Sequence, residues 1–176
     1  MSPISKSKLT FVHISVVVVW LVATIMAAHY FVSKRMAPFD SNNQLADIEV
    51  QYLFKRLYDE GFIADKNSKA IIHFTADGCR CNKVPKDHKV EIDKLVKSEG
   101  FEVINKKLNS QLSDIVPAAP SVVVVDRGQL VYLGPYSAGY SCSKTNSFVD
   151  MAINNHLQGF SSDVVVSDVT GCFCQV

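Results

Sequence analysis

The pattern of hydrophobic and polar positions divides the chain into an apolar N-terminal segment and a longer region of alternating elements. The segment from Leu9 to Val32 contains no Lys, Arg, Asp or Glu, and about 20 apolar residues suffice to span a bilayer core. We therefore predict a transmembrane helix over residues 9–32, after an N-terminal flank over residues 1–8. Lys6 and Lys8 also suit the start of a cleaved secretory signal, but the apolar stretch is longer than usual and Ile25 to Ala28 is a poor cleavage site. An uncleaved signal anchor is favoured.

Helical and strand-like patterns alternate beyond a polar linker predicted over residues 33–43. Apolar residues recur at helical spacing from Gln44 to Tyr58, and the run from Ala70 to Thr75 is typical of a buried strand. Strands that alternate with helices predict an α/β domain with a central sheet covered on both faces. The later expected elements are a helix from Val84 that stops at Gly100, a strand over 101–105, a partly helical stretch to Ile115, a hairpin over 122–133, and a helix capped by Ser143.

This order predicts one folded domain over residues 44–157, followed by a tail over residues 158–176. A chain of 176 residues can hold one domain of the usual 100 to 150 residues, together with appendages. We expect the domain to fold without the anchor, from a start between Asp40 and Leu45. The 18 basic residues nearly balance the 17 acidic ones, so no nucleic-acid partner is expected. The membrane is the partner that the segment from Leu9 to Val32 predicts.

The candidate chemistry lies in the cysteines, of which the chain has five. The strand ending at Thr75 leads through Asp77 and Gly78 into Cys79-Arg80-Cys81, at the predicted start of a helix. Backbone N–H groups at a helix N-terminus stabilise a thiolate, and the charge of Arg80 adds to this. We therefore expect Cys79 to be the most reactive thiol. Disulfides persist in exported domains, so the number of cysteines favours export.

The position of Cys79 after an apolar strand, and the segment Ala119-Pro120-Ser121 before another strand, resemble the thioredoxin-like superfamily. The similarity covers roughly Gln44 to Leu157 and is greatest to an uncharacterised group of membrane-anchored bacterial thioredoxin-like proteins. It implies a thioredoxin-like central sheet flanked by helices, with a cis bond at Pro120 beside the redox cysteines. It also implies a bacterial inner-membrane location with a periplasmic domain. His73 would take the place of a buried proton acceptor, although the residue pattern equally suits a core histidine satisfied by a hydrogen bond.

The cysteine spacing departs from that family, whose motif is Cys-x-x-Cys. Here only Arg80 separates Cys79 from Cys81. Side chains two residues apart on a helix point about 200° apart, so a direct disulfide between these two cysteines would be strained and labile. The resolving cysteine for Cys79 is therefore left open: it is Cys81, where the loop bends locally to accept the bond, or another cysteine.

Three further cysteines are candidates for that role. Cys142 precedes the last predicted helix, and Cys172 and Cys174 lie in the tail. At about 3.3 Å per residue, the tail from Leu157 to Cys172 can span roughly 50 Å and reach the first cysteines. The tail pair could resolve a mixed disulfide, close a structural bridge or complete a metal site. That metal site would consist of Cys79, Cys81, Cys172 and Cys174.

Three classes of function follow. The leading hypothesis is a membrane-tethered thiol–disulfide redox protein, an oxidoreductase if catalytic, that uses Cys79 and a resolving cysteine on a protein thiol or disulfide without a cofactor. The second is a thiolate site for copper or zinc; His88 lies nearby in sequence, but its place on an apolar helical stripe favours packing. The third is a non-catalytic interaction module with the same fold.

Overall fold

The computed structural model describes residues 6–143, 145–160 and 163–175, and for residues 6–9 it describes the backbone only. Residues 1–5 of the expected N-terminal flank lie outside the described residues. The chain forms two compact units, Met1–Arg35 and Met36–Val176, and each is considered by itself.

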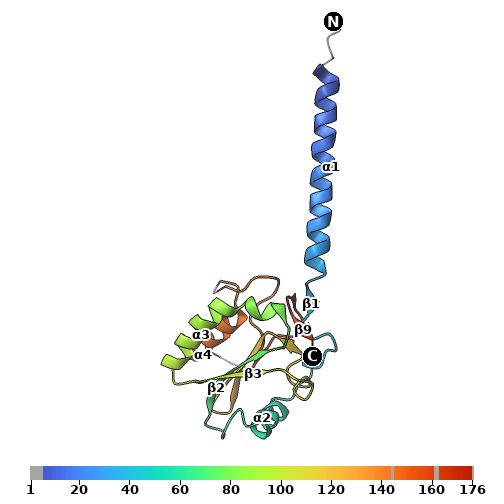
Figure 1. Cartoon of the computed structure of the whole chain (residues 1–176). Coiled ribbons are helices and arrows are strands. Elements are labelled where there is room, and N and C mark those ends of the chain that lie inside the picture. The colour runs from blue at the N-terminus through green and yellow to red at the C-terminus, as the bar shows by residue number, and fades with distance from the viewer. Residues whose placement is uncertain (1–5, 144, 161–162, 176) are drawn as a thin grey trace. The chain divides into compact units, whose positions relative to one another are not determined.

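The first unit is the helix α1 (Lys6–Ser33), which is continuous in Figure 1. Its segment Thr10–Ser33 is long and apolar enough to cross a membrane, a property that a signal sequence shares. The hydroxyls of Ser15 and Thr24 donate hydrogen bonds to the carbonyl oxygens of Phe11 and Trp20, at 2.9 and 2.8 Å. These polar groups are thus satisfied within the helix, which suits an apolar environment. A helix at the predicted position is confirmed.

The second unit is built on a five-stranded mixed sheet, which confirms the predicted α/β class. The strand order is β3-β2-β5-β6-β7. β2 runs parallel to β3 and β6 runs parallel to β7, whereas the pairs β2–β5 and β5–β6 are antiparallel. The strands are β2 (Lys69–Thr75), β3 (Glu102–Lys107), β5 (Ser121–Asp126), β6 (Gln129–Pro135) and β7 (Val164–Val165).

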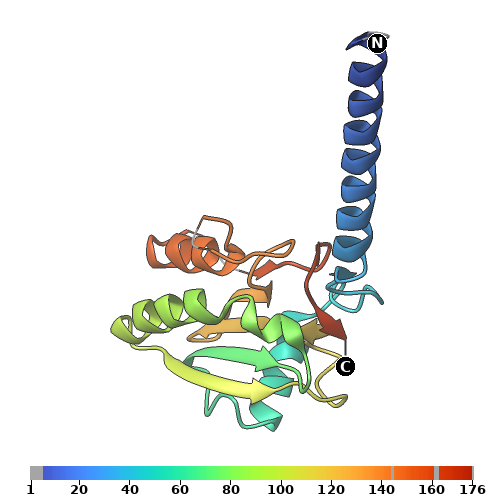
Figure 2. The ribbon, with the colours of Figure 1, turned by 45° about the horizontal axis from the view of Figure 1, so that its top comes forward.

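Helices cover both faces of this sheet. On one face, α2 (Val50–Asp59) contributes to the apolar cluster that contains Ile72. On the other face, α3 (Lys86–Ser98) and α4 (Phe148–Leu157) contribute to the cluster that contains Ile71. Figures 1 and 2 show α3 and α4 side by side. Neighbouring residues of β2 enter opposite clusters because successive strand side chains point to opposite faces.

The predicted hairpin is confirmed in β5 and β6, and its turn explains the sequence between them. Arg127 and Gly128 have φ values of 48° and 80°. Positive φ at both central residues is the requirement of the two-residue turn whose twist matches that of the flanking strands. Gly128 meets this requirement without a side-chain clash.

Three helix predictions outside the Cys79 loop differ from the structure. The helix expected from Gln44 begins at Val50, and the Asp40 carboxylate instead accepts hydrogen bonds from the backbone N–H groups of Gln44 and Leu45, at 3.0 and 2.7 Å. The stretch up to Ile115 consists of turns. The last helix is capped by Ser147, not Ser143: the Ser147 hydroxyl accepts a hydrogen bond from the Asp150 N–H at 3.2 Å. Local turns thus take the place of the expected first residues of two helices, and of the whole of the third helical stretch.

Short strands outside the main sheet bring the two ends of the second unit together. The segment expected as a linker contains β1 (Ala37–Pro38), which pairs with β8 (Thr170–Gly171) in the expected tail. Phe39, the residue that follows β1, is fully buried. The compact unit therefore starts earlier than Asp40, and both the expected linker and the expected tail contribute to its fold.

Candidate thiol–disulfide site

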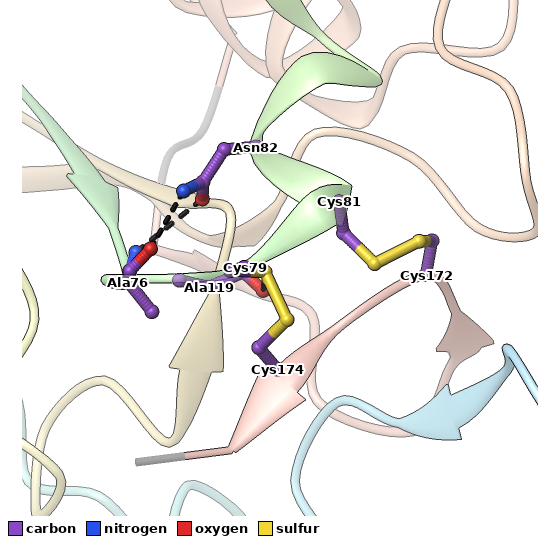
Figure 3. The surroundings of a disulfide bond; sticks show 7 residues. All are labelled: Ala76, Cys79, Cys81, Asn82, Ala119, Cys172 and Cys174. Carbon is purple, nitrogen blue, oxygen red and sulfur yellow. Dashed lines mark hydrogen bonds between the residues drawn. A yellow bond between two sulfur atoms is a disulfide. The ribbon is translucent and has the colours of Figure 1, made fainter.

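The site begins at the loop between β2 and α3. Gly78 (φ 68°) turns the chain, and Cys79 directly precedes a 3-10 helix, η1 (Arg80–Lys83). The Asn82 amide Nδ2 donates to the Ala76 carbonyl oxygen at 2.7 Å, and its Oδ1 accepts from the Ala76 N–H at 3.3 Å (Figure 3). This paired contact fixes the loop that carries Cys79 against the end of β2.

The predicted helix start at Cys79 needs a correction. η1 has four residues, and α3 starts only at Lys86. The field of a helix acts within its first turn, so the dipole of α3 does not act directly on Cys79. The exposure and neighbours of Cys79 must therefore account for any special reactivity.

The two Cys-x-Cys pairs are bonded to each other. Cys79 forms a disulfide with Cys174 and Cys81 forms one with Cys172, with Cα–Cα distances of 6.0 and 5.4 Å. The two segments thus meet with opposite chain directions, as Figure 3 shows. Of the partners left open by the sequence, the structure selects the tail cysteines for both members of the first pair.

The two bridges differ in exposure. The residues at both ends of the Cys81–Cys172 bridge are buried, with 8% and 6% of their surface exposed. Cys79 and Cys174 are only partly buried at the edge of the apolar cluster. An incoming thiolate must reach a sulfur atom, and the residues of the Cys79–Cys174 bridge are the more exposed of the two pairs.

A cis-proline lies beside this accessible bridge. The Ala119–Pro120 peptide bond is cis, as predicted. The Cys79 Sγ lies 3.9 Å from the carbonyl oxygen of Ala119. Ala119 belongs to β4 (Ala118–Ala119), which pairs with β9 (Cys174–Gln175).

The tail is held by more than its cysteines. Phe173 is buried, and its ring packs edge-to-face on Phe39 with 5.3 Å between the ring centroids. The Gln175 side chain donates to the carbonyl oxygen of Pro38 at 2.8 Å. No local pattern in the sequence assigns roles to Asn82, Phe39 or Phe173; the one signal for this contact is the equal spacing of the two cysteine pairs.

Cys142 remains a free thiol. It lines the same small cavity as Pro120 and Cys172, but it takes part in neither bridge. Burial raises the pKa of the Cys142 thiol, the nearby Asp150 raises it further, and a hydrogen bond with Ser137 partly offsets both effects. Cys142 is therefore a poor source of thiolate near neutral pH.

His73 lies on the face of β2 that is directed toward α3. It is buried, its Nδ1 is hydrogen-bonded to the Tyr136 hydroxyl, and its Nε2 lies 2.8 Å from an Asp93 carboxylate oxygen, although that pair lacks good hydrogen-bond geometry. Burial lowers the pKa of His73, which favours the neutral ring. Cys79 packs on the cluster of the opposite face. The structure does not bring His73 and Cys79 together.

His88 is also buried in the packed core and has a polar partner. It is buried, and its Nε2 lies 2.5 Å from a carboxylate oxygen of Asp150 in α4. This contact joins α3 to α4 and agrees with the packing interpretation of the sequence.

The sulfur atoms form a compact cluster. The Sγ atoms of Cys79, Cys81 and Cys174 all lie within 4.8 Å of one another. Disulfide sulfurs are not thiolate ligands, so the oxidised cluster cannot bind a metal in that way. After reduction, the same atoms together with Cys172 would offer soft ligands of the kind that zinc and Cu(I) prefer.

The fold and the site define a small α/β domain whose C-terminal segment is fastened by two disulfides to the loop after β2. Residues 49–176 match a family described as a domain of unknown function, DUF6436. The match covers more than half of the chain, so the protein belongs to this family. No curated protein and no solved structure matches the chain. All four bridged cysteines lie within the family region.

Proposed function

We propose that the protein is a membrane-tethered thiol–disulfide redox protein with a thioredoxin-like fold, and that Cys79–Cys174 is its exchanging bridge. The observation that carries the proposal is the partial exposure of this bridge beside the cis Ala119–Pro120 bond. The strand-to-loop position of Cys79 and the neighbouring cis-proline both support the resemblance to thioredoxin-like proteins. The buried Cys81–Cys172 bridge would have a structural role.

The exchange proceeds in two steps. A substrate thiolate attacks the Sγ of Cys79, the bond to Cys174 breaks, and Cys174 leaves as a thiolate. A second substrate thiolate then attacks the substrate sulfur of the mixed disulfide, and Cys79 leaves as a thiolate. Two electrons pass from the substrate dithiol to the bridge, and the substrate becomes a disulfide. In the reverse direction, the reduced pair reduces a substrate disulfide.

The second bridge keeps the exchanging cysteines close. When Cys79–Cys174 opens, Cys81–Cys172 still holds the tail two residues away from Cys174. The Cys174 thiolate therefore stays at a high effective concentration beside Cys79. This favours rapid closure of the bridge and release of a trapped substrate.

The apolar helix supports a single-pass anchor for this domain. We place the protein in the bacterial inner membrane with the domain in the periplasm, because two disulfides persist in an oxidising compartment. A thiol-reactive reagent that does not cross membranes tests this location. Labelling of Cys79 in intact cells after mild reduction is expected, and labelling only after lysis contradicts the proposed orientation.

Trapping of a mixed disulfide tests the exchange itself. In the full-length protein, Cys174→Ser leaves Cys79 as a free thiol without its resolving partner, so a disulfide substrate should accumulate as a stable adduct on Cys79. Mass spectrometry of the alkylated protein locates the adduct. Cys142→Ser is the matched control and should not trap substrate. Failure of Cys79 to form adducts with any disulfide in the Cys174→Ser protein contradicts the proposal.

The sulfur cluster supports a second candidate, a metal-binding role for the reduced protein. Four thiolates from Cys79, Cys81, Cys172 and Cys174 suit zinc or Cu(I), and three of the sulfurs already lie close together. Titration of the fully reduced protein with each metal, followed by metal analysis after gel filtration, tests this role. One bound metal that is lost in Cys79→Ser, with Cys142→Ser as control, supports it; no retained metal excludes it.

A further inference from the structure

The last strand of the chain occupies an edge beside the exchanging bridge. β9 pairs antiparallel with β4, and the register places Gln175 opposite Ala118 and Cys174 opposite Ala119. β4 lies outside the five-stranded sheet, and its pairing with β9 covers only two residues. A strand edge is a template on which another extended chain can pair through its backbone.

We propose that β9 occupies the edge of β4 to which a substrate strand binds. It thereby blocks access of the substrate to this edge beside Cys79 until the Cys79–Cys174 bridge opens. This inference rests on the proposed redox function. The substrate that replaces β9 is an extended polypeptide segment that carries a cysteine. It pairs with β4 in the register that Cys174 now has.

The existing disulfide shows why this register suits exchange. The residue opposite Ala119 is the one whose sulfur is bonded to Cys79, with 6.0 Å between the two Cα atoms. The Cys79 Sγ itself lies 3.9 Å from the Ala119 carbonyl oxygen. A cysteine of another segment that pairs with Ala119 in the same direction therefore presents its sulfur to Cys79.

The contacts of the tail indicate which part of it can leave. Cys172 and Phe173 are buried and remain fastened by the second bridge and by the Phe39 ring. Beyond them, Cys174 and Gln175 are held by the exchanging bridge, by the two-residue pairing and by the Gln175 side chain, which donates to the carbonyl oxygens of Pro38 and Phe39 at 2.8 and 3.3 Å. Opening of Cys79–Cys174 therefore removes the covalent tie on β9 and leaves only these hydrogen bonds to hold it.

A synthetic peptide that copies the tail provides the probe. The peptide has the sequence of residues 169–175 with Ser in place of Cys172, and its cysteine is activated as a mixed disulfide with thionitrobenzoate. It is added to full-length Cys174→Ser protein in detergent, in which Cys79 is free. The control peptide has proline on both sides of the cysteine, because proline lacks the N–H group that backbone pairing needs. The rate of thionitrobenzoate release at Cys79 is measured.

The expected result is that the pairing peptide reacts on the order of tenfold faster than the proline peptide, which corresponds to about 1.4 kcal/mol. Adding Gln175→Ala to the Cys174→Ser protein should accelerate the pairing peptide further, because β9 then leaves β4 more often, and should leave the rate of the proline peptide unchanged. Equal rates for both peptides, or no effect of Gln175→Ala, overturn the inference.

A small reagent separates this inference from the proposed function. Dithiobis(nitrobenzoate) reacts with an accessible thiol without any strand pairing. If Cys79 reacts with this reagent and with both peptides at similar rates, only the role of β9 is refuted. If Cys79 reacts with none of them, the redox function and the inference fall together.

Discussion

The two disulfides join the same two segments but differ in their surroundings. Cys79–Cys174 lies at a partly exposed edge beside the cis-proline, whereas Cys81–Cys172 is buried between the same segments. Although both Cys-x-Cys pairs have the same spacing and both bridges are disulfides, the two bridges therefore need not have the same role. Access to sulfur is what separates an exchanging bridge from a structural one.

The contributions of the two bridges to the free energy of unfolding are not additive. Their sequence separations are 95 and 91 residues, and closing a loop of that length removes chain entropy worth roughly 4.5 kcal/mol. Once one bridge is closed, the other closes a ring of only a few residues, for which the same relation gives roughly 2 kcal/mol. One bridge can therefore open while the fold persists.

The largest effect is expected when all four bridged cysteines are replaced by alanine in the fragment of residues 36–176. Its free energy of unfolding should fall by more than about 4 kcal/mol, because the long loop is no longer closed. Replacing only Cys79 and Cys174 should lower it by about 2 kcal/mol. Urea unfolding measures both values. If the two substitutions lower the free energy of unfolding as much as all four do, the remaining Cys81–Cys172 bridge does not keep the long loop closed as proposed.

The next effect tests whether the N-terminal part of the unit helps to hold the tail. Starting the fragment at Ser41 instead of Met36 removes β1 and the fully buried Phe39. The free energy of unfolding should fall by about 3 kcal/mol, since burial of a phenylalanine side chain contributes about 1.5 to 3 kcal/mol and the pairing with β8 is lost as well. Phe39→Ala in the longer fragment should give most of this loss. Equal stability of the two fragments would restore the linker interpretation.

A smaller effect concerns the order in which the bridges open. With increasing dithiothreitol, Cys79–Cys174 should be reduced on the order of tenfold faster than Cys81–Cys172, because its sulfur atoms are more accessible. Alkylation at successive times and mass spectrometry of the peptides measure this ratio. Simultaneous reduction of both bridges in native protein would remove the distinction between them.

The smallest effect concerns pH and the opposite face of the sheet. Burial lowers the pKa of His73 in the folded protein, so below its unfolded pKa of about 6.5 the unfolded chain binds a proton that the folded protein does not. Stability is therefore full above about pH 6.5 and falls on acidification toward the folded pKa, by at most about 1.4 kcal/mol per pH unit.

The His73→Gln variant separates this stability effect from the exchange chemistry. The slope just below pH 6.5 should become smaller in urea unfolding measurements, because glutamine does not titrate, whereas the slope at lower pH that comes from Asp114 and Asp126 should remain. The pH profile of Cys79 alkylation in the Cys174→Ser protein should stay the same, because His73 packs on the other face. A shift of that profile would restore His73 as a proton acceptor.

The sequence predicted the elements that have a strong local signal. The apolar runs of β2 and β5 and the Arg127-Gly128 turn were all found in the structure. The cis bond at Pro120, which was expected from the resemblance to thioredoxin-like proteins, is also present. The α2 start was wrong because Asp40 caps a turn at Gln44, a contact that resembles a helix start in sequence. Local hydrogen bonding by aspartate serves turns as well as helices.

The cysteine pairing could not be derived from the sequence for a different reason. It depends on β8 and β9, each of two residues, which meet partners far away in the chain. Strands this short have no measurable alternation of polar and apolar residues, and several pairings of the cysteines satisfy the reach of the tail. Only the folded arrangement distinguishes them.

The pairing of β1 with β8 has a mechanical consequence. A pulling force applied to the chain at Arg35 enters the second unit at Ala37, the first residue of β1, and passes through its backbone pairing to Gly171. The next residue, Cys172, is covalently bonded to Cys81 in the loop that follows β2. Part of such a load is thus carried through one short strand pair to a covalent bond, before the backbone leads on through Phe39 to the rest of the unit.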